Sequence, residues 1–467
     1  MSTSLFSPPA KSVSAPFSRV FCRNSRWLPL LAALWAAAGT ARAGTLLLSN
    51  AIVHTVSGGT LTNAAVLVRE GRIAEVGPGI GSADATVVDL KGQHLYPGMI
   101  ALDSGLGLIE IEAARATIDT AETGEYHPDI ESWVAVNPDS ELIPVTRANG
   151  ITHAEPAPQG GVVAGLSGVI ALDGWTVEQM TVKRAAALHV YWPEATLMLG
   201  SREGRGGGLG PRRARGEAGE AGGPKSPEEQ ARDRAAKIRE LDDFFQEARA
   251  YARARAAGRV ELNPPWEAML PVVAGEVPLV VHADDVRQIK SAVAWAGTNG
   301  LRIAIAGGRD AAMVAGLLAE KKIPVIFEHV FTLPRGIEHP YDLYFRAPGV
   351  LHAAGVKVVF SMGAAGMSAA HGRNLPYLAA QAAAFGLPED EALKGVTLYA
   401  AEVVGVADRL GSIEPGKEAS LVLADGSLLD ERTQVKRMWI AGREVDLSSR
   451  HTRLYQKYQG RPKPGAK

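Results

Sequence analysis

Four residues that could bind a metal ion lie near the predicted carboxyl ends of separate strands: Asp103, His189, His282 and His329. Glu328 adjoins the last of them. Neutral imidazoles together with one carboxylate form a donor set that suits zinc. If the strands bring these side chains to one point, the sequence predicts a site for one divalent ion, with zinc the best match. In the alternative interpretation, His189 and His329 are packed or solvated histidines and no ion is held.

Two further polar residues, His371 and Arg373, lie in a predicted loop that borders the same end of the strands. This position predicts a contact with an anionic group of a substrate. A surface ion pair is an equally good interpretation of the same two residues.

The centre of the chain alternates between short apolar strands and helical patterns. Strands are predicted at 278–282, 301–306, 323–327 and 356–360, and helices around 286–296, 311–320 and 375–385. Over residues 97–405 this alternation predicts an α/β fold, a (β/α)8 barrel with insertions. A doubly wound open sheet is the second interpretation, but no Gly-x-Gly-x-x-Gly follows an early strand to support it.

The two ends of the mature chain are rich in predicted strands. These lie at 45–53, 65–69, 72–76 and 86–90 near the N-terminus and at 419–424 and 435–440 near the C-terminus. Segments from opposite ends can pair around a central insert. We therefore predict a small β-sandwich domain made of residues 44–96 and 406–447, followed by a C-terminal tail at 448–467.

One segment inside the predicted barrel has a different composition. Residues 200–227 are rich in Gly, Arg and Glu and have almost no large apolar side chain, which predicts a flexible surface insertion. Residues 228–257 then predict one long charged helix, whose apolar stripe consists of Leu241, Phe244, Phe245 and Ala248.

Residues 1–43 have the pattern of a secretory signal peptide. A basic leader precedes the apolar run 27–38, which is too short to span a bilayer comfortably, and Ala41-Arg42-Ala43 matches a small-x-small cleavage site. We predict cleavage before Gly44, export to the periplasm or the medium, and no stable membrane anchor after cleavage. An uncleaved anchor and a wrongly assigned start codon are the alternatives.

Charge and cysteine content narrow the possible partners. The chain has 49 basic and 50 acidic side chains, and five of the basic ones lie in the leader, so the mature chain has 44 against 50 and a net charge of about −6. This balance argues against a nucleic-acid partner. The single cysteine, Cys22, is also in the leader, which excludes disulfides and cysteine metal ligands from the mature chain.

Several runs resemble one known family. The run 92–100, which contains Pro97-Gly98, resembles the barrel entry of the metal-dependent amidohydrolases, and the runs 400–406 and 410–422 resemble the tail of that family. The runs 149–152, 168–176 and 373–377 resemble its imidazolonepropionase-like branch. This resemblance implies a barrel that hydrolyses non-peptide carbon–nitrogen bonds, for example in cyclic amides, with a divalent metal that activates water.

The resemblance also implies that most of the usual metal ligands are missing. The two histidine positions of the first strand fall on Asp103 and Gly105, whereas His282 matches the histidine of the fifth strand. Gly307 and Gly308 stand where the sixth-strand histidine would be, and no carboxylate follows Phe360 in place of the eighth-strand aspartate. A fourth-strand lysine or glutamate bridge cannot be assigned.

Two functions of different kinds follow. In the first, the chain is a hydrolase of the amidohydrolase type with one metal in a remodelled or weakened site. In the second, it is a non-catalytic pseudoenzyme that binds a small molecule or partners an active paralogue. A purely structural subunit is a third and weaker interpretation, and a homo-oligomer is compatible with all three. Metal content separates the first two.

Overall fold

The computed structural model describes residues 44–194, 226–334 and 336–461. The predicted leader at 1–43, residues 200–225 of the predicted insertion and the last six residues of the tail lie outside the described residues. Ser226 and Pro227, which were predicted to end the insertion, instead begin a helix.

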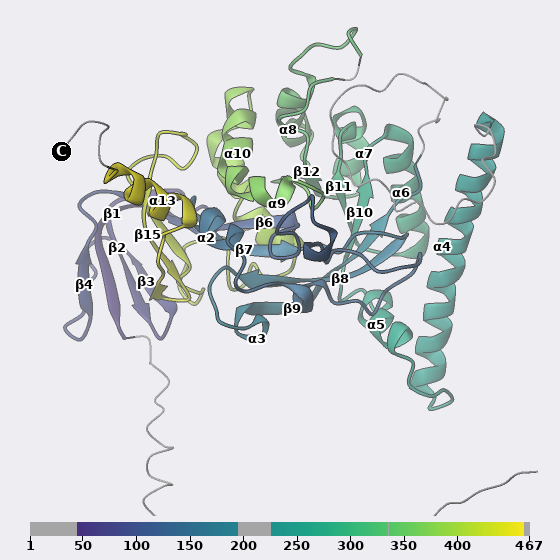
Figure 1. Cartoon of the computed structure of the whole chain (residues 1–467), viewed down its shortest axis with the longest axis horizontal. Coiled ribbons are helices and arrows are strands. Elements are labelled where there is room, and N and C mark those ends of the chain that lie inside the picture. The colour runs from purple at the N-terminus through teal and green to yellow at the C-terminus, as the bar shows by residue number, and fades with distance from the viewer. Residues whose placement is uncertain (1–43, 195–225, 335, 462–467) are drawn as a thin grey trace, which may run out of the picture. The chain divides into compact units, whose positions relative to one another are not determined.

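Strands from both ends of the chain form one eight-stranded sheet, as predicted (Figure 1). Its strand order is β16-β15-β14-β5-β1-β2-β3, with β4 also paired to β1. The join between the two ends is the antiparallel pairing of β14 with β5, in which Leu421 lies opposite Pro97. A common core that includes Leu48, Val66 and Trp439 holds the sheet together. The strands are β1 (Leu46–His54), β2 (Thr60–Arg69), β3 (Arg72–Gly77), β4 (Thr86–Asp89), β5 (His94–Pro97), β14 (Leu421–Ala424), β15 (Val435–Ile440) and β16 (Arg443–Glu444).

The central strands form a second eight-stranded sheet, which is a nearly closed barrel with strands in sequence order from β6 to β13. Its last and first strands are linked where Ser361 Oγ donates to the carbonyl oxygen of Leu102 at 2.8 Å. This closure confirms the barrel and excludes the open doubly wound sheet. The strands are β6 (Met99–Ser104), β7 (Ile151–Pro156), β8 (Val163–Ala171), β9 (Thr181–Tyr191), β10 (Leu279–Ala283), β11 (Ile303–Gly307), β12 (Val325–Phe327) and β13 (Val358–Phe360).

One strand departs from the regular βα repeat that was predicted. β8 is antiparallel to both of its neighbours, β7 and β9, whereas the remaining pairs are parallel. The connection from β7 to β8 covers only residues 157–162. A parallel crossover needs about a dozen residues or more, so this short connection can only return the chain as a hairpin.

Helices surround the barrel strands (Figure 1). The predicted long helix is α4, which begins with a capping box formed by Ser226 and Glu229 and buries Leu241, Phe245 and Ala248. It is tied to α6 where Trp295 Nε1 donates to Asp242 at 3.2 Å. The helices after β9 are α4 (Pro227–Ala256), α5 (Pro264–Val273), α6 (Val286–Asn299), α7 (Ala315–Glu320), α8 (Leu343–Ala353), α9 (Ser368–His371), α10 (Leu375–Ala384), α11 (Glu389–Gly395), α12 (Leu398–Val403) and α13 (Arg450–Gln459).

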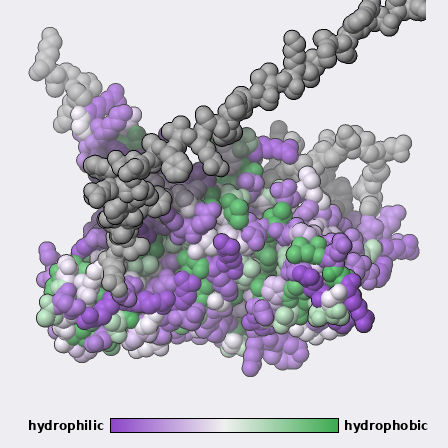
Figure 2. Space-filling view, turned by 90° about the horizontal axis from the view of Figure 1, so that it is seen from below, coloured by the Kyte–Doolittle hydropathy of each residue, from purple (hydrophilic) through white to green (hydrophobic). Residues whose placement is uncertain are grey.

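Shorter helical segments lie in the loops. They are η1 (Arg115–Thr117), η2 (Ser132–Ala135), α2 (Leu142–Arg147), α3 (Val177–Met180), η3 (Ala311–Val314) and η4 (Gly372–Asn374). Among the described residues, no helix combines the length and the apolar character that crossing a membrane requires. On the face drawn in Figure 2, hydrophobic side chains are scattered in small groups among hydrophilic ones.

Close packing at Gly98 joins the two sheets and leads directly into β6. A Cβ atom at this position would lie 2.0 Å from Thr152 Oγ1 and 2.7 Å from Thr152 Cβ. We predict that Gly98→Ala lowers the free energy of unfolding by roughly 1–3 kcal/mol, because the β-branched Thr152 cannot move away without shifting β7. Urea denaturation measures this change.

The matched control for this prediction is Gly297→Ala. Gly297 lies within α6, and a Cβ atom there would meet nothing within 4 Å. This substitution should be neutral or stabilising by about 0.5–1 kcal/mol, since alanine is the better helix former. Equal unfolding midpoints for the two variants would contradict the proposed packing at Gly98.

Candidate metal site in the barrel

Three of the four predicted metal ligands meet at the carboxyl end of the barrel. Asp103 lies on β6, His189 on β9 and His282 on β10, and one ligand atom from each lies within 4.8 Å of the others. β9 and β10 are adjacent and parallel, with His282 opposite Tyr191. His189 lies two residues before Tyr191 and therefore on the same face of β9, so the imidazoles of His189 and His282 are diagonal neighbours. All three side chains are largely removed from solvent, with 2% of Asp103 and 14% of His282 exposed.

A chain of polar contacts connects the three side chains. His189 Nδ1 and His282 Nε2 are 2.9 Å apart, and His282 Nδ1 lies 3.8 Å from Asp103 Oδ2. Burial lowers the pKa of His282 to about 4, against the opposing charge of Asp103. His282 is therefore neutral at neutral pH and has a lone pair available for a metal ion.

Asp103 shows a signature of a missing partner. Its Oδ1 atom is buried and has no hydrogen-bond partner within the described part of the chain. Its backbone is also in the left-handed region, at φ 48°. An unpaired buried carboxylate oxygen beside two imidazoles fits a divalent ion, and one oxygen with two nitrogen donors suits zinc. The residues present thus fit the metal that the sequence predicts.

Glu155 supports this group, and the sequence analysis missed it. The carboxylate is fully buried at the end of β7 and accepts from Ser167 Oγ at 2.6 Å and from the Asp103 N–H at 3.1 Å. Its Oε1 lies 3.4 Å from His189 Nε2. Burial raises the pKa of Glu155, but hydrogen bonds led by the one from His189 outweigh it and leave this pKa below its ordinary value. An ionised Glu155 orients His189 from behind.

Glu328 is a second buried carboxyl group at the site, and it follows β12 directly. Burial and the negative charge of Asp103 raise the pKa of Glu328 well above its ordinary value, which favours the protonated form of this carboxyl group beside the ligand group. From the sequence, Glu328 is recognised only as the neighbour of His329, with no role of its own.

His329 does not join the other three candidates. Its Nε2 lies 2.8 Å from Asp284 Oδ1, and Arg309 Nη1 lies 3.6 Å from the other oxygen of the same carboxylate. Burial raises the pKa of Asp284, but the hydrogen bond and charge of His329 reverse this and lower it. His329 thus belongs to a separate Asp–His–Arg cluster at the strand ends.

The two predicted substrate contacts lie outside the ligand group. His371 is exposed at the end of α9. The guanidinium of Arg373 lies 3.3 Å from His451 Nδ1 on α13, and the Arg373 carbonyl oxygen accepts from Asn149. Their contact with a substrate stays a prediction.

Aromatic and polar side chains pack around the ligand group. The ring of Tyr191 stacks on His282, with centroids 4.0 Å apart, and its hydroxyl donates to the Pro158 carbonyl oxygen. Gln159 Nε2 donates to the Ala364 carbonyl oxygen. A small cavity of about 10 Å³, about the space of one water molecule, lies beside Asp103, and neither His189 nor His282 lines it.

Comparisons with known proteins agree with this geometry. Residues 281–445 match the model of the Amidohydrolase family. A solved amidohydrolase from Thermotoga maritima MSB8 is 27% identical, with a TM-score of 0.72 over 86% of this chain and 99% of that one. A solved prolidase, complexed with N-methylphosphonate-L-proline, is 17% identical, with a TM-score of 0.52 over 86% of this chain and 99% of that one. The search of curated proteins finds no match.

The family match over residues 281–445 and the solved amidohydrolase of the same fold support the assignment of this chain to the amidohydrolase superfamily.

Two glycines at positions where the family resemblance predicts histidine ligands lie close to neighbouring atoms. A Cβ atom at Gly105 would lie 2.7 Å from the Ala364 carbonyl oxygen, and one at Gly307 would lie 2.7 Å from Asp284 Oδ1.

His153, two residues before Glu155 on β7, should make the stability of the protein depend on pH. Burial, with a contribution from the charge of Arg409, lowers the pKa of His153 from 6.5 to about 3. Because the unfolded chain binds this proton first, stability is fully present above pH 6.5 and is lost as the pH falls toward 3. We predict that uptake of a proton by His153 on unfolding lowers the free energy of unfolding by about 2 kcal/mol at pH 5 relative to pH 8.

The measurement is urea denaturation at both pH values for the wild type and His153→Gln. The loss of stability between pH 8 and pH 5 should be smaller in the variant by about that amount. The exposed His371 supplies the control, because His371→Gln should lose as much stability as the wild type. An unchanged loss in His153→Gln would contradict a neutral buried His153.

Proposed function

We propose that this protein hydrolyses a non-peptide carbon–nitrogen bond, such as that of a cyclic amide, with one divalent ion, most suitably zinc, held by Asp103, His189 and His282. The observation that carries the proposal is the convergence of these three donors from three strands, with Asp103 Oδ1 buried and unpaired among the described residues. Three protein ligands with an open fourth position are typical of catalytic rather than structural zinc sites.

The chemistry divides between the ion and the residues around it. When bound, a divalent ion supplies Lewis-acid polarisation of a carbonyl and lowers the pKa of water. Glu155 holds His189 in its orientation, and the stacked Tyr191 ring excludes water from one face of His282. The raised pKa of Glu328 favours its protonated form, and we propose that Glu328 would donate a proton to the departing nitrogen.

Two specific observations favour a second candidate, a non-catalytic member of the superfamily. The cavity beside Asp103 has room for about one water molecule, and two glycines stand where the family resemblance predicts histidine ligands. Such a protein would bind a small molecule or act with an active paralogue. Absence of a metal ion would exclude the hydrolase. A non-catalytic protein that still holds an ion would have the same metal content as the hydrolase but no turnover, so both metal content and turnover must be measured.

Metal content tests the site itself. We predict close to one zinc ion per chain after purification without chelators, measured by inductively coupled plasma mass spectrometry. Asp103→Asn and His282→Ala should each lower zinc affinity by at least about tenfold, since each removes one of three ligands. His329→Ala is the matched control, because His329 bonds to Asp284 instead. Zinc-free wild type after loading and dialysis would refute the metal site.

Turnover then separates the two candidates. The zinc-loaded protein is assayed with cyclic amides, N-acyl amines and dipeptides, and kcat/KM is compared with that of Asp103→Asn and Glu328→Gln. A hydrolase should lose at least about a hundredfold in Glu328→Gln, in line with the loss of a general acid. Stoichiometric zinc without turnover on any of these substrates would favour the non-catalytic candidate.

We further propose that the chain is exported and acts in the periplasm or the medium. The support is the order of basic leader, short apolar run and small-residue cleavage site in residues 1–43. Expression in a bacterial host followed by N-terminal sequencing should give a chain that begins at Gly44. A retained leader on a cytoplasmic product would contradict export.

A further inference from the structure

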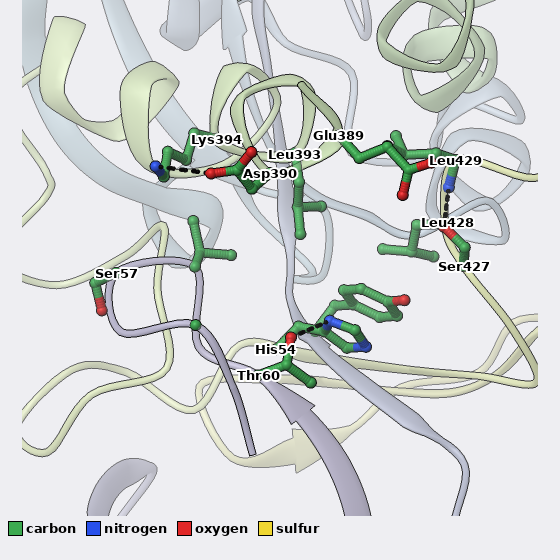
Figure 3. Close-up of a pocket in the computed structure, with 13 residues that line it drawn as sticks. His54, Ser57, Thr60, Glu389, Asp390, Leu393, Lys394, Ser427, Leu428 and Leu429 are labelled. Atoms are coloured by element: carbon green, nitrogen blue, oxygen red, sulfur yellow. Dashed lines mark hydrogen bonds and ion pairs between the residues drawn. The ribbon is translucent and has the colours of Figure 1, made fainter. Parts of the chain in front are cut away.

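A second and much larger cavity lies away from the barrel site, between the sheet domain and α11 (Figure 3). Its volume is about 400 Å³, which is within the range of small-molecule sites. Its walls come from the end of β1 with the turn and the start of β2 that follow it, from Tyr96 of β5, from α11 and from the loop after β14. Its lining includes aromatic, apolar and acidic side chains: His54, Val56, Tyr96, Glu389, Leu393 and Leu428.

One wall is a rigid stack of aromatic rings. The rings of His54 and Tyr96 are parallel within 6°, with centroids 4.1 Å apart. His54 is fixed on both sides, by Thr60 Oγ1 at 3.1 Å from Nδ1 and by His94 at 2.9 Å from Nε2. Burial and the neighbouring His94 lower the pKa of His54 to about 4. This wall is therefore flat and uncharged at neutral pH.

Apolar side chains contribute part of the other walls, beside polar ones. Leu393 of α11 and Leu428 of the loop after β14 border the cavity, and Val56 closes it from the turn after β1. Val56 has φ 71°, a conformation that is costly for a β-branched residue and is held only where the surroundings require it. The turn is held by Thr55, whose N–H and hydroxyl both donate to the Gly59 carbonyl oxygen.

Of the charged side chains that line the cavity, the carboxylate of Glu389 has no partner among the described residues. Lys394 is satisfied by Glu391 at 2.6 Å and Asp390 at 3.5 Å. Glu389 forms no hydrogen bond or ion pair within residues 44–194, 226–334 and 336–461, and Figure 3 shows it on the side of the cavity away from Lys394. Burial raises the pKa of Tyr96 to about 12, so its hydroxyl is neutral at neutral pH, and Glu389 lines the same cavity.

We propose that this cavity binds a small organic cation with an aromatic or apolar body. An ammonium group would pair with the exposed carboxylate of Glu389, which lines the cavity. The body of the ligand would fill the space between the aromatic stack and Leu393. The site is distinct from the barrel metal group and does not depend on whether the protein is a hydrolase.

The test uses the mature full-length chain and three probes of the same size: 2-phenylethylamine, 2-phenylethanol and phenylacetate. Binding is measured by isothermal titration calorimetry and saturation-transfer NMR. The amine should bind roughly fivefold more tightly than the alcohol, as expected for one exposed charge pair, and phenylacetate should bind least. Glu389→Gln should remove the preference of the amine over the alcohol.

Two further variants complete the design. Leu393→Trp fills the cavity and should abolish binding of both amine and alcohol, with circular dichroism showing that the fold is retained. Glu75→Gln changes an exposed carboxylate on β3 that does not line the cavity, and it should bind like the wild type. Glu389→Gln remains informative if the tryptophan variant fails to fold, because Glu389 is exposed.

Three results would overturn the proposal. They are absence of binding of all probes at millimolar concentration, equal affinity of the wild type for amine and alcohol, and an amine preference that persists in Glu389→Gln. Binding that depends on Glu389 and is unchanged in Asp103→Asn would support a site separate from the barrel metal group.

Discussion

The candidate site depends on how the barrel accommodates the negative charge of Glu155 in its interior. A buried carboxylate is tolerated only when donors surround it, and here Ser167, His189 and the Asp103 N–H do so. These partners come from β6, β8 and β9, so the charge fixes three strands relative to one another. His189 is thereby aimed at His282, and the backbone of Asp103 is held where its side chain meets both imidazoles.

Two glycines stand where the family resemblance predicts histidine ligands. A Cβ atom at Gly105 would approach the Ala364 carbonyl oxygen, and one at Gly307 would approach Asp284, which pairs with His329. The ligand group itself is compact and polar, with the carboxyl group of Glu328, whose raised pKa favours its protonated form, beside the buried Asp103.

The way in which the two domains are joined produces the second cavity. The sheet domain is built from both chain ends, and β14 pairs with β5 immediately before the chain enters the barrel at Gly98. This pairing holds the turn after β1 and the loop after β14 against α11, and the space between them is lined by His54, Tyr96 and Leu428.

Residue patterns alone determined the barrel, the sheet shared by both chain ends and the long helix α4, because local periodicity and turn residues report on elements directly. They also singled out Asp103, His189 and His282, since strand-end positions in a barrel share one rim. Only the tertiary structure placed His329 on Asp284, reversed the direction of β8 and revealed Glu155 as the support of His189. The positions of His329 and Glu155 depend on contacts between residues far apart in the chain, and the lone carboxylate within Ile151–Pro156 was the local signal of the second. The reversal of β8 follows instead from the short connection 157–162.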